Sequence, residues 1–211
     1  MNFLRHPFRY RYDNVTLFLI GINILVFLAQ QVFADRYISE YLAMIPIAVI
    51  NGWIWQFVTY MFAHGGFTHL LFNMLALFIF GTQVERRMGS REFLLYYLLT
   101  GILAGVFSFL VYWFTGAYGV HLVGASGAIF AVQLAYAAFF PDAVIFIWGI
   151  LPVRAPIMVL GFTVLELVSS VFGFRSGVAH FTHLAGFAFG WIYFLARFDI
   201  NPWKALTGRG R

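Results

Sequence analysis

The chain has 211 residues, of which 62% are hydrophobic, 21% aromatic and only 10% charged. Soluble domains carry about 25% charged residues, so this composition excludes an ordinary soluble domain and predicts a membrane protein. The net charge of +5 does not indicate a nucleic-acid-binding surface, because the positive residues are scattered singly between apolar segments. Cysteine is absent, which excludes disulfides and thiolate metal sites.

Long apolar segments follow one another along nearly the whole chain. A helix that crosses a bilayer needs about 20 mostly apolar residues. On this criterion the sequence predicts an all-α fold, a compact bundle of six transmembrane helices that forms a single domain over residues 1–211. The expected spans are residues 14–33, 66–87, 92–115, 126–140, 153–173 and 178–198. No small-residue cleavage site follows the first apolar segment, so we expect no cleavable signal peptide.

The connection between the first two spans, residues 34–65, is rich in tryptophan and tyrosine. It is too apolar for a solvated loop, and these aromatic side chains favour the headgroup layer. We therefore expect this first loop to be embedded in the membrane.

The positive residues predict the orientation of the bundle. Six spans place both termini on one side, and an excess of positive residues marks the cytoplasmic side of a membrane. With cytoplasmic termini, only Arg36 and Arg175 of the 13 Lys and Arg residues lie outside. The positive residues expected inside are Arg5, Arg9, Arg11, Arg86, Arg87, Arg91, Arg154, Arg197, Lys204, Arg209 and Arg211.

Several polar residues then fall at one depth in the outer half of the membrane. His69 and Asn73 lie in the first turns of the second span, and His183 lies about 8 Å into the sixth, at the helical rise of about 1.5 Å per residue. The fourth span is about 22 Å long against an apolar core of about 30 Å. Ser126 at its start therefore lies below the outer surface.

Ser126 lies in Gly124-Ala125-Ser126-Gly127, a small-residue turn at the start of the fourth span. Glycine permits a tight backbone there, and the free N–H groups of a helix N-terminus suit a developing oxyanion. One reading is a catalytic serine. The other is that the small residues only pack helices.

His183 is the candidate general base toward Ser126. Glu166 lies in the fifth span, and nothing in the sequence places it near His183, so we predict a Ser–His dyad. His180, three residues before His183, shares its helical face and is either a partner of the site or a structural residue.

His69 and Asn73 are four residues apart, so both side chains face the same way. Each can donate a hydrogen bond to a substrate oxyanion. The alternative is hydrogen bonding between helices, which polar residues in membranes commonly make.

Two further groups of residues have structural interpretations. Gly186 and Gly190 follow His183 at positions that let the sixth helix approach the fourth closely. Glu85, Arg86 and Arg87, at the cytoplasmic end of the second span, are expected to cap and anchor that end without a catalytic role.

Together these motifs resemble those of the rhomboid family of intramembrane serine proteases. The chain is similar to a minimal, six-helix, bacterial-type member without additional soluble domains, over about residues 14–198. The matching residues are His69-x-x-x-Asn73, Gly81-x-x-x-Glu85-x-x-x-Gly89, Gly124-Ala125-Ser126-Gly127 and His183-x-x-Gly186-x-x-x-Gly190.

The resemblance implies roles for individual residues. Ser126 would be the nucleophile and His183 the base, while His69, Asn73 and the backbone N–H of Ser126 would form the oxyanion hole. Gly124 would line the site beside the nucleophile. The fifth span and the loop after it, residues 173–179, would form a gate and a cap for the substrate helix. No metal or organic cofactor is implied.

The chain departs from the family pattern at two places. Many relatives have Trp-Arg in the first loop, where this chain has Trp55-Gln56, so an arginine that orders the loop is missing. Phe130 stands where some bacterial members have a tyrosine that stacks on the catalytic histidine. A phenyl ring can also stack, but it has no hydroxyl. Neither change removes a reacting group, so we expect activity.

The predicted function is an intramembrane serine endopeptidase that cleaves transmembrane helices of membrane proteins near the outer face. Its partners would be such substrates and the lipid bilayer of a prokaryotic plasma membrane. One alternative is an inactive relative that binds transmembrane helices without cutting them. Another is a metal or haem protein that uses His64, His69, His180 and His183, although the sequence offers no carboxylate beside these histidines.

Overall fold

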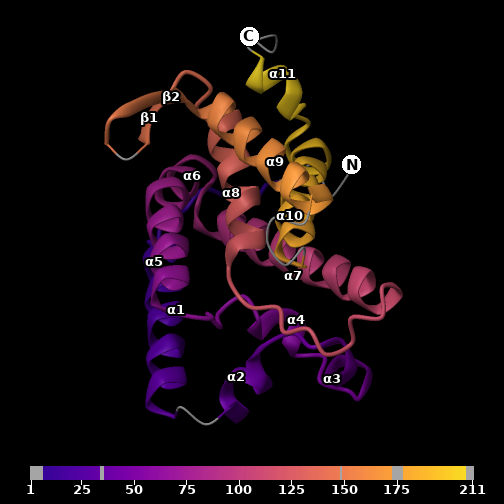
Figure 1. Cartoon of the computed structure of the whole chain (residues 1–211). Coiled ribbons are helices and arrows are strands. Elements are labelled where there is room, and N and C mark those ends of the chain that lie inside the picture. The colour runs from indigo at the N-terminus through magenta and orange to yellow at the C-terminus, as the bar shows by residue number, and fades with distance from the viewer. Residues whose placement is uncertain (1–6, 34–35, 148, 173–177, 208–211) are drawn as a thin grey trace.

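The computed structural model describes residues 7–33, 36–147, 149–172 and 178–207. Its helices form a bundle, with the short helices of the first loop gathered at one end (Figure 1). The predicted helical fold is confirmed, with one small hairpin added to it.

Three helical segments of the described chain are long and apolar enough to cross a membrane. The first is α1 (Val15–Val32) and the third is α7 (Ser90–Phe114). The second, residues 67–88, consists of α5 (Phe67–Ala76), a π-helical segment η2 (Leu77–Gly81) and α6 (Thr82–Met88) without a break. Their bounds agree closely with the first three predicted spans.

The other three predicted spans are also helical. They correspond to α8 (Ser126–Phe139), α9 (Ala155–Phe172), and α10 (Val178–Tyr193) followed directly by η3 (Phe194–Phe198). Helix α8 is short and lies in the middle of the bundle, in contact with α7, α9 and α10. Alanines make up much of its surface and are almost wholly buried, which lets the neighbouring helices pack close to it.

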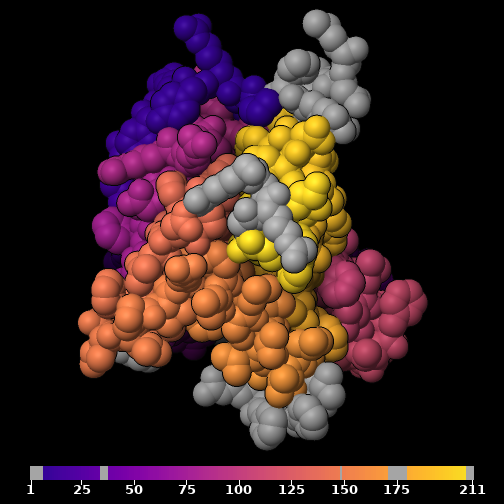
Figure 2. Space-filling model, turned by 90° about the horizontal axis from the view of Figure 1, so that it is seen from above, coloured from indigo at the N-terminus to yellow at the C-terminus, as the bar shows by residue number. Residues whose placement is uncertain are grey.

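A hairpin and a short helix were not expected, and the hairpin takes up residues 153 and 154, the first two of the predicted fifth span. Strands β1 (Val144–Ile147) and β2 (Leu151–Arg154) form an antiparallel hairpin between α8 and α9, and α11 (Pro202–Leu206) is a short helix near the C-terminus. Figure 2 shows this end of the molecule, with the hairpin and α9 in orange and the C-terminal helices in yellow.

The first loop is compact and largely helical. It contains α2 (Arg36–Leu42), α3 (Pro46–Ile50) and α4 (Gln56–Thr59), and a β-bridge joins Met44 to Leu122. Hydrogen bonds therefore tie this loop to the segment that leads into α8.

Gln56 stands at the position where the resemblance implied an arginine, and it links two parts of the first loop. Its side chain is fully buried. Oε1 accepts a hydrogen bond from the N–H of Ile45 (3.0 Å), and Nε2 donates to the carbonyl of Glu40 (2.9 Å). The neutral amide thus links two parts of the loop without placing a charge in its interior.

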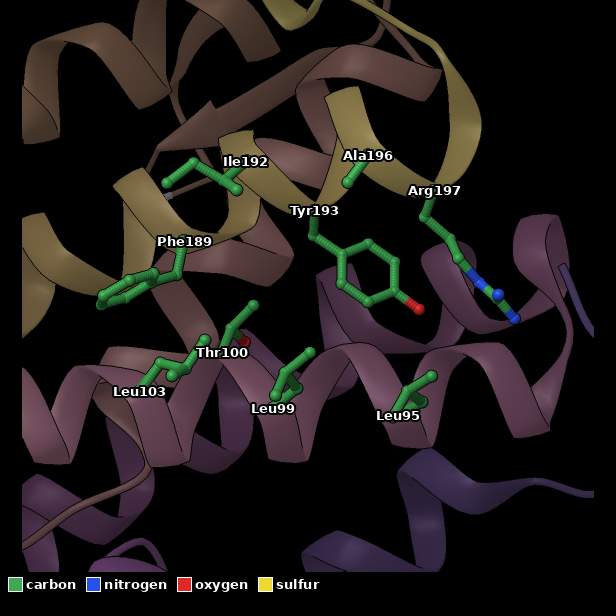
Figure 3. A pocket seen from close by; sticks show the side chains of 9 residues that line it. All are labelled: Leu95, Leu99, Thr100, Leu103, Phe189, Ile192, Tyr193, Ala196 and Arg197. Atoms are coloured by element: carbon green, nitrogen blue, oxygen red, sulfur yellow. The ribbon is translucent and has the colours of Figure 1, made fainter. Parts of the chain in front are cut away.

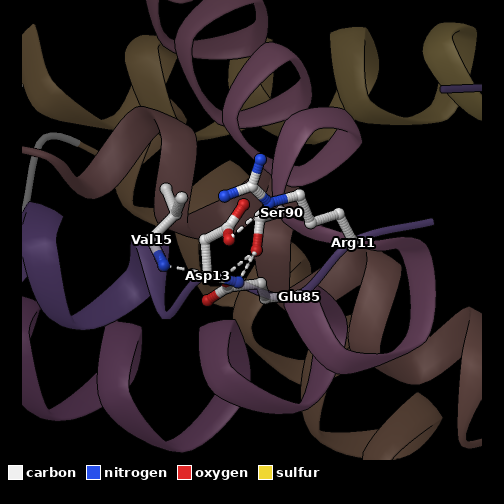
Figure 4. Close-up of polar contacts among 5 residues, drawn as sticks. All are labelled: Arg11, Asp13, Val15, Glu85 and Ser90. Atoms are coloured by element: carbon white, nitrogen blue, oxygen red, sulfur yellow. Dashed lines mark hydrogen bonds and ion pairs between the residues drawn. The ribbon is translucent and has the colours of Figure 1, made fainter. Parts of the chain in front are cut away.

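Two buried carboxylates hold the opposite end of the bundle together. Glu85 accepts hydrogen bonds from the N–H groups of Val15 and Thr16 and from the hydroxyl of Ser90, so it caps α1 and joins it to α6 and α7 (Figure 4). Glu92 pairs with Arg197, whose Nε lies 2.7 Å from Oε1. Glu85 thus has a structural role, as predicted, but it caps the start of α1 and not the end of the second span.

Candidate active site

The backbone before α8 holds Ser126 at the start of that helix. Gly124 has φ of +115°, a conformation that side-chain-bearing residues rarely adopt, and its N–H donates to the carbonyl of Tyr60 at 2.8 Å. The chain turns there and enters α8 at Ser126. The first N–H groups of α8 have no acceptor within the helix, so they are available to an anion beside Ser126.

His183 reaches Ser126 from α10. Its Nε2 lies 2.7 Å from Oγ of Ser126, within hydrogen-bond distance. The imidazole ring is stacked on the phenyl ring of Phe130, one turn into α8, with centroids 4.5 Å apart and planes within 4° of parallel. The stacking restrains the ring, so that Nε2 stays directed at the serine.

Glycines allow the close approach of α8 and α10 that this contact requires. A Cβ at Gly186 would lie only 1.9 Å from the carbonyl oxygen of Gly127, and a Cβ at Gly190 would lie 3.0 Å from Cβ of Ala131. The predicted role of Gly186 and Gly190 is therefore confirmed.

His69 and Asn73 face the same site from α5. A Cβ at Gly124 would lie 2.8 Å from Cε1 and Nε2 of His69, so the imidazole packs directly against the backbone that leads to Ser126. The Asn73 amide donates one hydrogen bond to the carbonyl of His69 at 3.0 Å. An amide group has two N–H donors, so one remains to bind a ligand.

An open pocket of about 480 Å³ connects these groups. Ser126, His183, His69 and Asn73 all line it, so the groups that the sequence placed at one depth meet in space. Gln133, which the sequence analysis did not single out, lies one turn beyond Phe130 and also lines the pocket. The remaining lining residues are Thr68, Phe72, Ala76, Leu122, Val123, Ile129, Phe130 and Thr182.

The expectation that no acidic residue accompanies His183 is wrong. Oε1 of Glu166, on α9, lies 3.1 Å from Nδ1 of His183. Oε2 of the same carboxylate is hydrogen-bonded to Nδ1 of His180. The sequence analysis could not find this contact, because it depends on the rotation of α9 about its axis and on how α9 packs against α10. A carboxylate in the middle of an apolar span was the available signal.

Glu166, His180 and His183 form the one group in the described part of the chain with ligand atoms placed to hold a metal ion, within 4.8 Å of one another. The expectation that no carboxylate lies beside the histidines is corrected by the same contact. His64 does not belong to this group. Its ring packs against that of His69, with centroids 5.1 Å apart.

A second cavity shares no lining residue with the pocket around Ser126. Figure 3 shows a crevice of about 210 Å³ between α7 and the α10–η3 helix. Its lining is mostly aliphatic and aromatic and contains neither histidine nor carboxylate. The crevice therefore has no pair of a hydroxyl and a histidine like the one at Ser126.

The predicted gate is only partly within the described residues. Helix α9 carries exposed apolar side chains, among them Leu160, Val164 and Leu167. The predicted cap, residues 173–179, lies mostly outside the described residues, and the structure places only the first residues of α10 within it.

Comparison with known proteins supplies the family. A rhomboid domain model matches residues 51–199. The rhomboid protease AarA of Providencia stuartii is 30% identical over 198 residues, covering 83% of this chain and 69% of AarA. The rhomboid protease GlpG of Haemophilus influenzae is 30% identical over 182 residues, covering 85% of this chain and 88% of GlpG. The Bacillus subtilis protein YdcA is 40% identical over 86 residues, and the match covers 41% of each protein. With these matches and its apolar helices, the chain is an integral membrane protein of the rhomboid family.

Proposed function

We propose that this chain is an intramembrane serine endopeptidase that cleaves transmembrane helices of other membrane proteins near the outer face of the bilayer. The observation that carries the proposal is the 2.7 Å contact between Oγ of Ser126 and Nε2 of His183 in an open pocket. Further support comes from relatives named rhomboid proteases.

The first half of the reaction forms an acyl-enzyme. Oγ of Ser126 attacks the carbonyl carbon of the scissile peptide bond while Nε2 of His183 takes the hydroxyl proton. The tetrahedral intermediate carries its negative charge on the former carbonyl oxygen. When it collapses, the C–N bond breaks, His183 gives the proton to the leaving amine, and an ester to Ser126 remains.

The second half hydrolyses that ester. Water enters through the open pocket, and His183 takes one of its protons as the water oxygen attacks the ester carbonyl. The proton then returns to Oγ of Ser126, and the carboxylic acid product leaves. Both halves use only side chains and water, so the proposed reaction needs neither metal nor organic cofactor.

The oxyanion hole would consist of the Ser126 N–H, the His69 ring and the Asn73 amide, with Gly124 as the close-packed wall beside the nucleophile. Ser126, His69 and Asn73 all line the same pocket. Donors fixed in advance stabilise the oxyanion without reorganisation, and removal of one such donor typically slows a hydrolase by about 10²- to 10³-fold.

Substrate would reach Ser126 from within the bilayer. A transmembrane helix weakened by glycine or proline could unwind near the outer interface, and the unwound segment would then enter the pocket. With both termini cytoplasmic, the pocket would lie in the outer half of a prokaryotic plasma membrane. Helix α9 would be the side of the bundle that moves to admit the substrate.

Labelling with a fluorophosphonate probe tests the proposal first. We expect the detergent-solubilised protein to become covalently labelled, and Ser126→Ala and His183→Ala to abolish labelling. The same proteins in vesicles should cleave a model transmembrane peptide only when both residues are intact. His69→Ala and Asn73→Ala should each retain labelling but lower cleavage by about 10²- to 10³-fold.

The opposite result has a definite meaning. If the folded parent protein neither labels nor cleaves, yet retains transmembrane peptides in a pull-down from mixed vesicles, then it binds helices without cutting them. Thermal unfolding of each variant, followed in the same detergent, separates the loss of a reacting group from the loss of the fold.

A further inference from the structure

Glu166 lies next to the candidate active site but has no role in the reaction proposed for Ser126 and His183. Its carboxylate lies between two histidines of α10, with Oε1 3.1 Å from Nδ1 of His183 and Oε2 hydrogen-bonded to Nδ1 of His180. About a fifth of its side chain is exposed, against 16% for His183. A carboxylate in the middle of an apolar helix is costly in a membrane, and such residues are usually functional.

The two ring nitrogens of His183 have different surroundings. Nε2 faces Ser126, so Nδ1 points to the other side of the ring, where the carboxylate lies. This Nδ1 is buried and has no well-aligned hydrogen bond within the described part of the chain. Glu166 is therefore the acceptor closest to satisfying it.

We propose that Glu166 is a positioning residue that completes a Ser126–His183–Glu166 triad in the proposed peptidase. An acceptor at Nδ1 keeps the proton on that nitrogen and leaves the lone pair of Nε2 free to take the proton of Ser126. The imidazolium that results carries a positive charge 3.1 Å from a carboxylate oxygen. This interaction exists only after proton transfer, so it accelerates the chemical step.

His180 holds the carboxylate in this place. Its Nδ1 hydrogen-bonds Oε2 of Glu166, which leaves Oε1 directed toward His183. Hydrogen bonds at active sites are often long or poorly aligned without substrate and tighten during the reaction.

The same three residues could instead hold a metal ion. The structure favours direct contact, because the carboxylate already interacts with both rings and no ion is needed to hold the group together. The two readings differ in a measurable way, since only a metal site responds to chelators.

Replacement of the carboxylate by an amide of the same shape tests the triad. For Glu166→Gln we expect kcat for cleavage of a model transmembrane peptide in vesicles to fall about 10- to 100-fold, with KM within about twofold, because the negative charge that stabilises the imidazolium of His183 is lost. The rate of fluorophosphonate labelling at Ser126 should fall by a similar factor.

Thr163→Val is the matched control. Thr163 lies one turn before Glu166 on α9, and within the described residues its hydroxyl bonds only the carbonyl of Val159 at 2.9 Å. This variant changes the polarity of the same helix without touching His183, so kcat and labelling should match the parent. A purely structural loosening of α9 would instead change KM or the temperature of thermal unfolding.

The possible outcomes separate the two proposals. A parent that labels, with Glu166→Gln labelling and cleaving equally fast, overturns the triad but leaves the peptidase intact. A parent that neither labels nor cleaves overturns both. Treatment of the parent with a chelator should leave kcat unchanged; if it reproduces the loss seen in Glu166→Gln, a bound metal replaces the triad.

Discussion

Contacts with three neighbouring side chains fix the position of the His183 ring in the site. The imidazole of His183 is held between the phenyl ring of Phe130, the hydroxyl of Ser126 and the carboxylate of Glu166. Each neighbour restrains a different degree of freedom: stacking sets the ring plane, and the two polar contacts set its rotation in that plane. Phe130 provides this restraint without a hydroxyl, so the tyrosine of some relatives is not needed for stacking.

Replacement of Gly124 tests the close packing beside the nucleophile. In Gly124→Ala, a Cβ would lie 2.8 Å from Nε2 of His69, and φ of +115° would be strained. We expect the His69 ring to shift and kcat to fall by about 100-fold, since a misplacement of about 1 Å can cost that much. Cleavage of a transmembrane peptide in vesicles measures the effect.

Gly119→Ala is the appropriate comparison. It lies in the same loop, but a Cβ there would meet nothing within 4 Å in the described part of the chain, and its φ is not positive. Its kcat should equal that of the parent. Parent-like activity in Gly124→Ala would show that the contact with His69 is dispensable.

At the scale of elements, the contact between α8 and α10 brings the nucleophile and the base together. The carbonyl of Gly127 and the backbone of Gly186 are so close that no side chain fits between them. Transmembrane helices are held together mainly by such packing and by hydrogen bonds. The hydrophobic effect does not drive their association, because lipid tails are as apolar as the helices. The hydrogen bond between the hydroxyls of Ser108 and Thr182 (2.6 Å) joins α7 to α10.

Gly186→Ala should force these two helices apart. A Cβ only 1.9 Å from the Gly127 oxygen cannot be accommodated by moving a flexible side chain. We expect a loss of at least about 1–3 kcal/mol in the free energy of unfolding, the usual cost of overpacking, together with slower labelling at Ser126. Denaturant unfolding in detergent measures the first effect.

Gly161→Ala provides the matched glycine substitution in a neighbouring helix. A Cβ at Gly161, on α9, would meet no atom of the described residues within 4 Å, and alanine stabilises a helix more than glycine does. This variant should be as stable as the parent or slightly more so. Equal stability of both variants would mean that α8 and α10 separate without cost.

At the scale of the whole molecule, the bilayer makes much of the fold readable from sequence. Span length and apolar composition predicted helices at nearly the observed bounds, and glycine spacing predicted the close approach at Gly186. Interactions across the bundle were not readable in this way. The contact of Glu166 with His183 depends on helix rotation, and the replacement of an arginine by Gln56 depends on backbone groups of Glu40 and Ile45. The β1–β2 hairpin was missed because most of it lies in the connection before the predicted fifth span, and its last two residues were assigned to that span.

Glu85 holds together the end of the bundle that lies away from the first loop. Its carboxylate is fully buried and accepts hydrogen bonds from Val15, Thr16 and Ser90, which lie on α1 and α7. In Glu85→Ala these donors lose their acceptor. We expect the free energy of unfolding to fall by about 3 kcal/mol or more, because buried donors to a charged group are left unpaired.

The loss should appear in stability and not in chemistry, because Glu85 does not line the pocket around Ser126. Labelling of the still-folded Glu85→Ala protein at low temperature should proceed at the parent rate, whereas denaturant unfolding should occur earlier. Asp13→Asn is the control at the same end of the bundle, since its ion pair with Arg11 is exposed and should contribute less than about 1 kcal/mol (Figure 4). If Glu85→Ala slowed labelling while fully folded, the two ends of the bundle would be coupled, and α1 would contribute to the geometry around Ser126.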